Sequence, residues 1–155
     1  MLLWLYMKRS YSQKELSEVA KEVLSSIKPL DDKATVIALY GELGAGKTTL
    51  VQAIASELGV EELVVSPTFV IAKWYKTNAN TFYTLVHIDA YRIDSEEEMK
   101  ILGFTELLKQ PRALVIVEWP EKIPETLSTL HVEMFTLHHD GEVRVIEGPL
   151  PYEGK

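Results

Sequence analysis

Cysteine is absent from this chain of 155 residues. Without thiols the chain can form neither disulfide bridges nor a thiolate metal site, and the absence fits a reducing compartment.

Long apolar runs are absent too: the stretch MLLWLYM ends at Lys8 and Arg9, well short of the roughly 20 apolar residues of a membrane span. These positive residues follow the apolar stretch instead of preceding it, unlike a secretory signal peptide. We therefore expect a cytoplasmic protein that does not enter a membrane.

Positive charge is scarce. The chain carries 16 Lys and Arg against 23 Asp and Glu, so its formal net charge is −7. An acidic surface repels the phosphate backbone of nucleic acids, so we expect any role near RNA to run through a partner protein. Hydrophobic residues make up 46% and charged residues 25%, the balance of a folded globular chain. The length is that of one ordinary domain, and we expect residues 1–155 to form one.

The apolar pattern predicts helices alternating with strands. Apolar spacing of three and four residues predicts a helix over 12–27. Further helices are expected over 47–58 and 95–103, and one or two helical turns over 104–109. Capping boxes and terminal glycines support their boundaries, namely Ser12 with Glu15, Ser95 with Glu98, Gly59 and Gly103. Buried strands are expected over 34–40 and 113–119, and hairpins over 69–89 and around Asp140-Gly141. This order predicts an α/β fold with a mixed sheet covered by helices on both faces.

The segment GELGAGKTTL, residues 41–50, lies between the first buried strand and the second helix. Gly41, Gly46, Lys47 and Thr48 match the pattern G-x-x-x-x-G-K-[ST], the P-loop. Glycines allow backbone N–H groups to face phosphates closely, and the following helix adds the positive end of its dipole. The lysine then faces the β- and γ-phosphates, and the threonine hydroxyl is a ligand for Mg²⁺. The loop therefore predicts a nucleoside triphosphate site.

Two acidic residues end predicted strands and are candidates for the metal site. Glu118 ends LVIVE, and Asp89 follows TLVHI. On an extended strand His87, Asp89 and Tyr91 share one face, because side chains alternate. Taken alone, His87 and Tyr91 are typical core or rim residues. With a P-loop nearby, at least one acidic strand end is expected to serve Mg²⁺ and another group to position water, and the residues alone leave the choice open.

The segment SPTF, residues 66–69, follows the P-loop helix, where many P-loop proteins carry a switch segment. Taken alone, it is more typical of a Ser-Pro turn that opens a strand. Trp119 directly follows Glu118, so it is either a packing residue or a wall of the site.

Four motifs occur in the order GELGAGKTT, SPTF, HIDAYR and EWPEK, with EEEMKILGFTELL between the last two. As a set they resemble the TsaE (YjeE) family, the ATPase component of bacterial tRNA threonylcarbamoyladenosine synthesis. The resemblance runs from the first helix to Lys122 and is looser in the C-terminal hairpin. It implies a P-loop NTPase-like, three-layer α/β/α fold with a mixed, mainly parallel sheet, which binds ATP and Mg²⁺.

The resemblance also implies roles for individual residues. Thr48 and Glu118 become the magnesium ligands, and Asp89 the catalytic carboxylate near the γ-phosphate, with Lys47 and Glu118 completing the catalytic set. Adenine is expected between the start of the first helix and the C-terminal strands, where Gln13 and Arg144 are the expected contacts. The full nucleotide-binding set that we expect is Gln13, Gly41, Leu43, Gly44, Ala45, Gly46, Lys47, Thr48, Thr49, Ser66, Thr68, Trp119 and Arg144.

The resemblance further implies TsaB and TsaD as partners and contact with tRNA only through their complex. In the family, TsaD transfers a threonylcarbamoyl group to adenosine 37 of tRNA. The ATPase, which the P-loop at residues 41–48 indicates here, supports turnover of that complex. We expect slow hydrolysis by the chain alone and stimulation by the partners. Residues 1–7 have no counterpart in the family pattern, and we interpret them as a leader: a start-site or cloning artefact, or an extra edge strand.

Two other functions fit a P-loop. A small kinase that phosphorylates a metabolite usually carries a cluster of lid arginines, whereas the four arginines here are scattered at positions 9, 92, 112 and 144. A nucleotide-dependent switch with little hydrolysis fits SPTF, and the same protein can be a switch and an ATPase at different moments.

Overall fold

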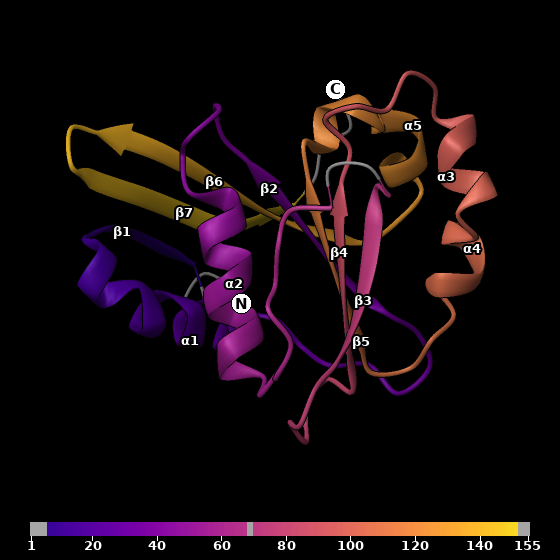
Figure 1. Ribbon diagram of the computed structural model, residues 1–155, viewed down its shortest axis with the longest axis horizontal. Helices are drawn as coiled ribbons and strands as arrows, with labels where there is room; N and C mark the ends of the chain where they lie inside the picture. The colour runs from indigo at the N-terminus through magenta and orange to yellow at the C-terminus, as the bar shows by residue number, and fades with distance from the viewer. Residues whose placement is uncertain (1–5, 68–69, 152–155) are drawn as a thin grey trace.

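The structure is a computed structural model that describes residues 6–67 and 70–151. Its centre is a seven-stranded sheet with the spatial order β1-β7-β6-β2-β5-β4-β3 (Figure 1). Strands β6, β2, β5 and β4 pair in parallel, and the pairs at both edges are antiparallel. The strands in chain order are β1 (Met7–Tyr11), β2 (Thr35–Tyr40), β3 (Ala72–Lys76), β4 (Thr84–Asp89), β5 (Ala113–Glu118), β6 (Val132–Asp140) and β7 (Val143–Pro151).

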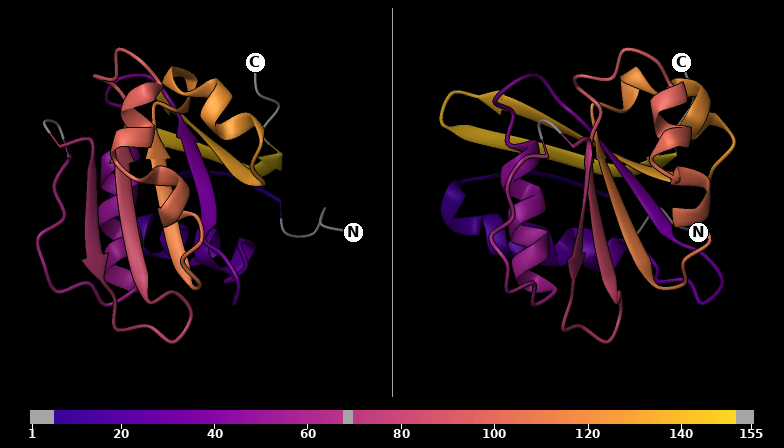
Figure 2. Two further views of the ribbon diagram at one scale, coloured as in Figure 1. Left: turned by 90° about the vertical axis from the view of Figure 1, so that its right-hand side faces the viewer. Right: turned by 45° about the vertical axis from the view of Figure 1, so that its right-hand side comes forward.

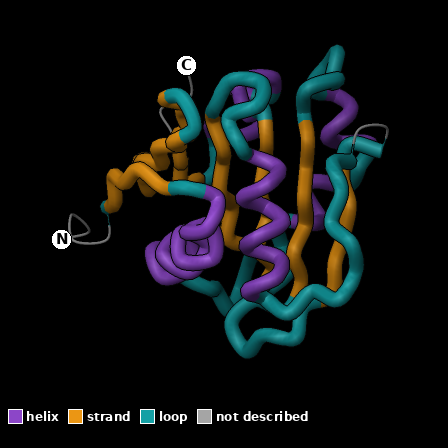
Figure 3. Tube along the Cα trace, turned by 60° about the vertical axis from the view of Figure 1, so that its left-hand side comes forward, coloured by secondary structure: helices purple, strands orange, loops and turns teal. Residues whose placement is uncertain are grey.

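Helices cover both faces of the sheet. On one face lie α1 (Leu16–Ser26), which follows the 3-10 turn η2 (Gln13–Glu15), and α2 (Lys47–Glu57). Figure 3 shows α2 crossing in front of the strands, with short helices behind them. Those on the second face are α3 (Glu97–Ile101), α4 (Phe104–Leu107) and α5 (Pro124–Ser128), the last preceded by the 3-10 turn η3 (Pro120–Lys122) (Figure 2). The expected three-layer α/β/α architecture is thus confirmed.

Alternation along the central strands builds two cores. Ile37 in β2 and Ile116 in β5 face α1 and α2, whereas their neighbours Val36 and Val115 face α3, α4 and α5. All of these side chains are buried. Strands buried on both faces read as continuous apolar runs, which is why 34–40 and 113–119 were recognisable from sequence. The same alternation turns Glu118, two residues beyond Ile116, toward α2.

Both predicted hairpins are present. β3 and β4 are antiparallel, with Tyr75 opposite Leu85, and β6 and β7 turn at Gly141, whose φ is 65°. Strand β1 begins at Met7 and pairs with β7 at the edge of the sheet. Of the predicted leader, residues 1–5 lie outside the described residues. No helix within the described ranges has the length and apolar character to span a membrane.

The two capping predictions have different outcomes. The capping box of Ser12 with Glu15 is wrong: the Ser12 side chain makes no capping hydrogen bond, and Arg9 donates to the Glu15 carboxylate at 3.2 Å instead. The Arg9 guanidinium, on edge strand β1, therefore binds the carboxylate that the capping box would have used. At α3 the side chains of Ser95 and Glu98 do form capping hydrogen bonds, but each bonds to a backbone N–H one residue away from the one that a capping box uses. The Glu97 N–H donates to Ser95 Oγ at 3.3 Å, and the Asp94 N–H donates to the Glu98 carboxylate at 3.1 Å.

A matched pair of substitutions tests the core assignment. Ile116→Ala is expected to lower the free energy of unfolding by about 2–5 kcal/mol, because its side chain is 0% exposed and leaves a cavity. Ile101→Ala, at a position 85% exposed, is expected to change it by less than about 0.5 kcal/mol. Urea denaturation measures both values, and equal losses would contradict the burial of β5.

Candidate functional site

The topology gathers the predicted site residues at one edge of the sheet. Strands β2, β5 and β4 are parallel neighbours, so their carboxyl ends lie side by side. The P-loop follows β2, Glu118 ends β5, and Asp89 ends β4 directly opposite Glu118 in the strand register. Open α/β sheets bind ligands at this edge. The two carboxylates that were alternatives in the sequence therefore belong to one site.

The P-loop places Lys47 at the first turn of α2. Gly46, the residue before the helix, has φ 100°, and Gly44 has φ 81°, both in the region that favours glycine. A Cβ at Gly41 would lie 2.9 Å from the Leu137 carbonyl oxygen, so this position admits no side chain without a shift. Thr48 and Thr49 lie in the same first turn of α2, half-buried. The loop geometry that the motif predicts is present.

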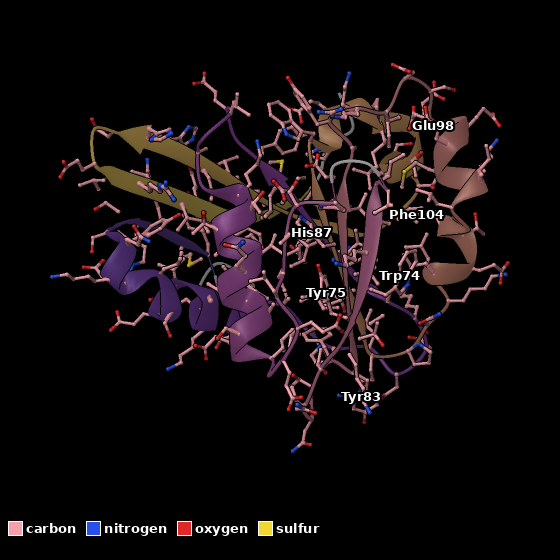
Figure 4. All side chains as sticks on the ribbon, in the orientation of Figure 1. Trp74, Tyr75, Tyr83, His87, Glu98 and Phe104 are labelled. Carbon is pink, nitrogen blue, oxygen red and sulfur yellow. The ribbon has the colours of Figure 1, made fainter. Side chains whose placement is uncertain are left out.

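Glu118 is the centre of the buried contacts at the site. Its side chain is 2% exposed, and the Thr48 hydroxyl lies 3.0 Å from both of its carboxylate oxygens. From the other side, His87 Nε2 bonds to one of the same oxygens, and the imidazole is completely buried in the interior (Figure 4). The carboxylate is an acceptor, so Nε2 carries the donated proton. Among the described residues Nδ1 has no hydrogen-bond partner.

Lys47 is almost fully buried, at 5% exposure. Its ammonium donates to the Gly41 carbonyl and lies 3.7 Å from the centre of the Trp119 ring, a cation–π contact. Burial lowers the pKa of Lys47 below its ordinary value, while the carboxylates of Glu118, Glu121 and Asp89 act in the opposite direction. The charged ammonium is thus held at a site that partly desolvates it.

Asp89 is tied to the segment that precedes β3. Ser66 Oγ donates to one Asp89 oxygen at 3.1 Å, and the Tyr91 N–H donates to the other at 3.0 Å. The Asp89 N–H donates to the Ile71 carbonyl at 2.8 Å. The structure therefore brings Ser66 to Asp89. Thr68, also predicted for this site, lies outside the described residues.

The aromatic wall lies beside Lys47. Trp119 has φ 57°, an unusual value for a bulky residue, and strain of this kind is concentrated at functional sites. The Tyr91 ring lies 4.9 Å from the Trp119 ring, centre to centre. The sequence had left Trp119 and Tyr91 open as packing residues, and the structure places both at the rim of the P-loop.

The predicted adenine side is formed by the C-terminal hairpin. The Arg144 guanidinium lies against Gly46, where an added Cβ would be 3.0 Å from its central carbon. Arg144 is paired with Tyr11 in the strand register, and Gln13 lies exposed two residues beyond Tyr11. Arg144 is thus beside the loop, and Gln13 is on the neighbouring turn. Their contact with adenine stays a prediction, as does the remainder of the nucleotide-binding set.

His87 is the site residue that sequence reasoning undervalued. The available signal was its spacing, since His87 precedes Asp89 by two residues and shares its strand face. What the sequence did not contain was the partner, because Glu118 is 31 positions away and meets His87 only through the parallel pairing of β4 with β5.

Together, the fold and this site define the P-loop class of α/β nucleotide-binding folds. The chain belongs to the TsaE family: the family profile described as "Threonylcarbamoyl adenosine biosynthesis protein TsaE" matches residues 10–146. The resemblance read from the four motifs is therefore confirmed, and it connects the chain with the biosynthesis of tRNA threonylcarbamoyladenosine.

Individual relatives agree with the profile. The protein TsaE of Rickettsia felis is 36% identical over 124 residues, which cover 79% of this chain and 67% of the relative. TsaE of Bacillus subtilis is 37% identical over 119 residues, covering 77% of this chain and 69% of the relative. Among solved structures, YdiB of Bacillus subtilis superposes with a TM-score of 0.67 at 27% identity, covering 92% of this chain and 85% of that chain.

Removing the charge of Lys47 tests the desolvation that the site imposes. Lys47→Met is expected to raise the free energy of unfolding of the nucleotide-free chain at pH 7, because the folded state disfavours the buried ammonium. In the wild type this penalty is present below the lowered pKa and fades as the pH rises from there toward 10.5, since the unfolded chain holds its proton longer. Urea denaturation at pH 7 and pH 10 should therefore show the advantage of Lys47→Met shrinking at the higher pH. A variant less stable than wild type at pH 7 would contradict this account.

Proposed function

We propose that this chain is a Mg²⁺-dependent, cytoplasmic ATPase that supports threonylcarbamoyl modification of adenosine 37 in tRNA together with TsaB and TsaD, as its family membership suggests. The observation that carries the proposal is the contact of the Thr48 hydroxyl with the Glu118 carboxylate beside the P-loop. A hydroxyl at the start of the P-loop helix and a carboxylate at the end of a neighbouring strand are the protein ligands of Mg²⁺ in this class of site.

The residues present fit Mg–ATP on physical grounds. The glycine backbone of the loop and the N-terminus of α2 form an anion site, and Lys47 supplies a cation within it. Thr48 and Glu118 would hold the metal, which neutralises charge on the phosphates when bound. His87 holds the Glu118 carboxylate from the opposite side, so the ligand oxygens are oriented before metal arrives.

Hydrolysis requires a group that orients the attacking water. Asp89 ends the strand next to Glu118, is half-buried, and is held by Ser66 and the Tyr91 N–H. We assign it the water-positioning role, in which a fixed carboxylate accepts a proton from water as the water attacks. The link from Asp89 to Ser66 would also let this segment respond to the nucleotide, because the segment and the catalytic carboxylate share a hydrogen bond.

Separate substitutions distinguish the two carboxylates. Glu118→Gln is expected to weaken nucleotide binding chiefly in the presence of Mg²⁺, because one charged ligand is lost. Asp89→Asn is expected to retain Mg–ATP binding and to lower turnover by about 10²–10⁴-fold, the usual contribution of a general base. Mg²⁺ titrations of nucleotide affinity and single-turnover hydrolysis measure the two effects. Asp32→Asn, on an exposed loop, is the control. The reverse pattern would exchange the two roles.

The partners are tested by steady-state hydrolysis. We expect slow turnover by the chain alone and marked stimulation by a TsaB–TsaD complex, up to about 10³–10⁵-fold if the complex supplies an arginine finger. The net charge of −7 predicts no tight binding of tRNA by the isolated chain at physiological salt. Rapid hydrolysis that the complex leaves unchanged would reject partner dependence, and phosphate transfer to a small metabolite would identify a kinase instead.

A further inference from the structure

A cavity of about 420 Å³ lies beside the P-loop and outside the phosphate cradle. Its walls come from the end of β2, the start of the loop, the segment after β5 and the second half of β6. The lining includes Tyr40, Glu42, Trp119, Glu121, Thr136 and His138. None of the residues 44–49, which carry the cradle and the helix N-terminus, lines it. Gly41 and Leu43 also line it, and with Trp119 they belong to the predicted nucleotide-binding set, so the cavity adjoins the predicted nucleotide site without coinciding with the cradle at 44–49.

The strand alternation places this cavity on the second face of the sheet. Tyr40 follows Val36 and Ala38 on the face that carries α5, and Thr136 lies on the same face as Val132. The cradle at the start of α2 is on the opposite face. Trp119 joins the two spaces, since its ring lines the cavity and also contacts the Lys47 ammonium at 3.7 Å.

The chemistry of the cavity suits a cation. Two carboxylates, Glu42 and Glu121, and two aromatic rings, Tyr40 and Trp119, contribute to the lining, which contains no lysine or arginine. Aromatic faces and carboxylates together bind guanidinium groups well, because the planar cation stacks on the ring while its N–H groups donate to oxygen. Trp119 already holds one cation, Lys47, in this structure. The cavity is thus built to accept positive charge close to the predicted γ-phosphate end of the site.

We propose that this cavity receives an arginine side chain from the protein partner that stimulates hydrolysis, with the guanidinium held by Glu121 and Glu42 and stacked on Trp119. Lys47 is drawn to the phosphates when nucleotide binds, which frees the face of Trp119 that it covers here. Glu121, Glu42 and the triphosphate leave negative charge unbalanced at this place, and the incoming arginine neutralises part of it. The identity of the donor rests on the proposed function, whereas the preference of the cavity for guanidinium does not.

The cavity can be tested without any partner. The chain, ¹⁵N-labelled at tryptophan and loaded with Mg²⁺ and a non-hydrolysable ATP analogue, is titrated with N-acetyl-arginine amide and, separately, with its neutral isostere N-acetyl-citrulline amide at constant ionic strength. We expect a saturable shift of the Trp119 indole N–H with the arginine compound alone. Trp74, which lies on edge strand β3, is the internal control and should not shift (Figure 4).

Substitution then tests the carboxylates. Glu121→Gln, and independently Glu42→Gln, should each weaken the arginine response by about two- to fivefold, the size of one exposed ion pair. Glu125→Gln, a similar change four residues from Glu121 at a position that does not line the cavity, should leave it unchanged. An equal response to citrulline, or an unchanged affinity in both cavity variants, would overturn the proposal. The arginine–citrulline contrast needs only the wild-type chain, so it stands even if a variant fails to fold.

Hydrolysis with the TsaB–TsaD complex identifies the donor. The measured quantity is the ratio of stimulated to basal rate, which we expect to fall at least about tenfold in Glu121→Gln and to persist in Glu125→Gln, because a misplaced arginine finger loses much of its effect. Full stimulation of Glu121→Gln would refute an arginine entering this cavity while leaving partner dependence intact. Absence of stimulation in the wild type would instead reject the proposed function, and the titration would still decide what the cavity binds.

Discussion

The site depends on one constraint, the burial of the Glu118 carboxylate at 2% exposure. A charged group inside a protein is costly unless hydrogen bonds replace its water. Here the replacements come from Thr48 at the start of α2 and His87 in the middle of β4, so the same carboxylate ties three elements together. The pairing of β5 with both β2 and β4 is what makes this geometry possible. The pairing of the central strands therefore fixes the position of the two Glu118 carboxylate oxygens.

Several residues around the Glu118 carboxylate have energetically unfavourable or unusual conformations and environments. Lys47 is desolvated enough that its pKa is lowered, Gly44 and Gly46 take positive φ values, and Trp119 takes one that is unusual for a bulky side chain. The desolvated ammonium and the Trp119 backbone oppose stability, and the two glycines take φ values that other residues disfavour; all four lie in the loop, the first turn of α2 and the residue after β5. Function explains the cluster better than folding does, because Lys47, Gly44 and Gly46 belong to neither core and Trp119 is only partly buried against one of them. An anion placed in the cradle would interact favourably with the ammonium and with the loop N–H groups.

Much of the fold could be predicted from sequence because its signals are local. Continuous apolar runs marked β2 and β5, the Asp140-Gly141 turn marked a hairpin, and the P-loop motif placed Lys47 and Thr48. Contacts between distant residues could not be read in this way. Ser12 and Glu15 have the spacing of a capping box, yet Arg9 takes the glutamate, and His87 looked like a core residue until strand pairing placed it against Glu118. Local pattern predicts elements, while the assignment of side-chain partners needs the register of the sheet.

The distribution of charge at the site bears on the partners that we propose. Glu118, Asp89 and Glu121 all interact electrostatically with the Lys47 ammonium, so three carboxylates act on the cation that the P-loop provides. A triphosphate adds further negative charge to this region, more than one lysine and one divalent metal can balance. The Arg144 guanidinium lies against Gly46, on the side of the loop formed by the hairpin. The charge that develops during hydrolysis would thus arise where the described chain concentrates acidic groups, and stabilising it calls for a cation from outside. If hydrolysis by the chain alone is slow, as we propose, the carboxylates that would disfavour it are also groups that could hold such a cation in place.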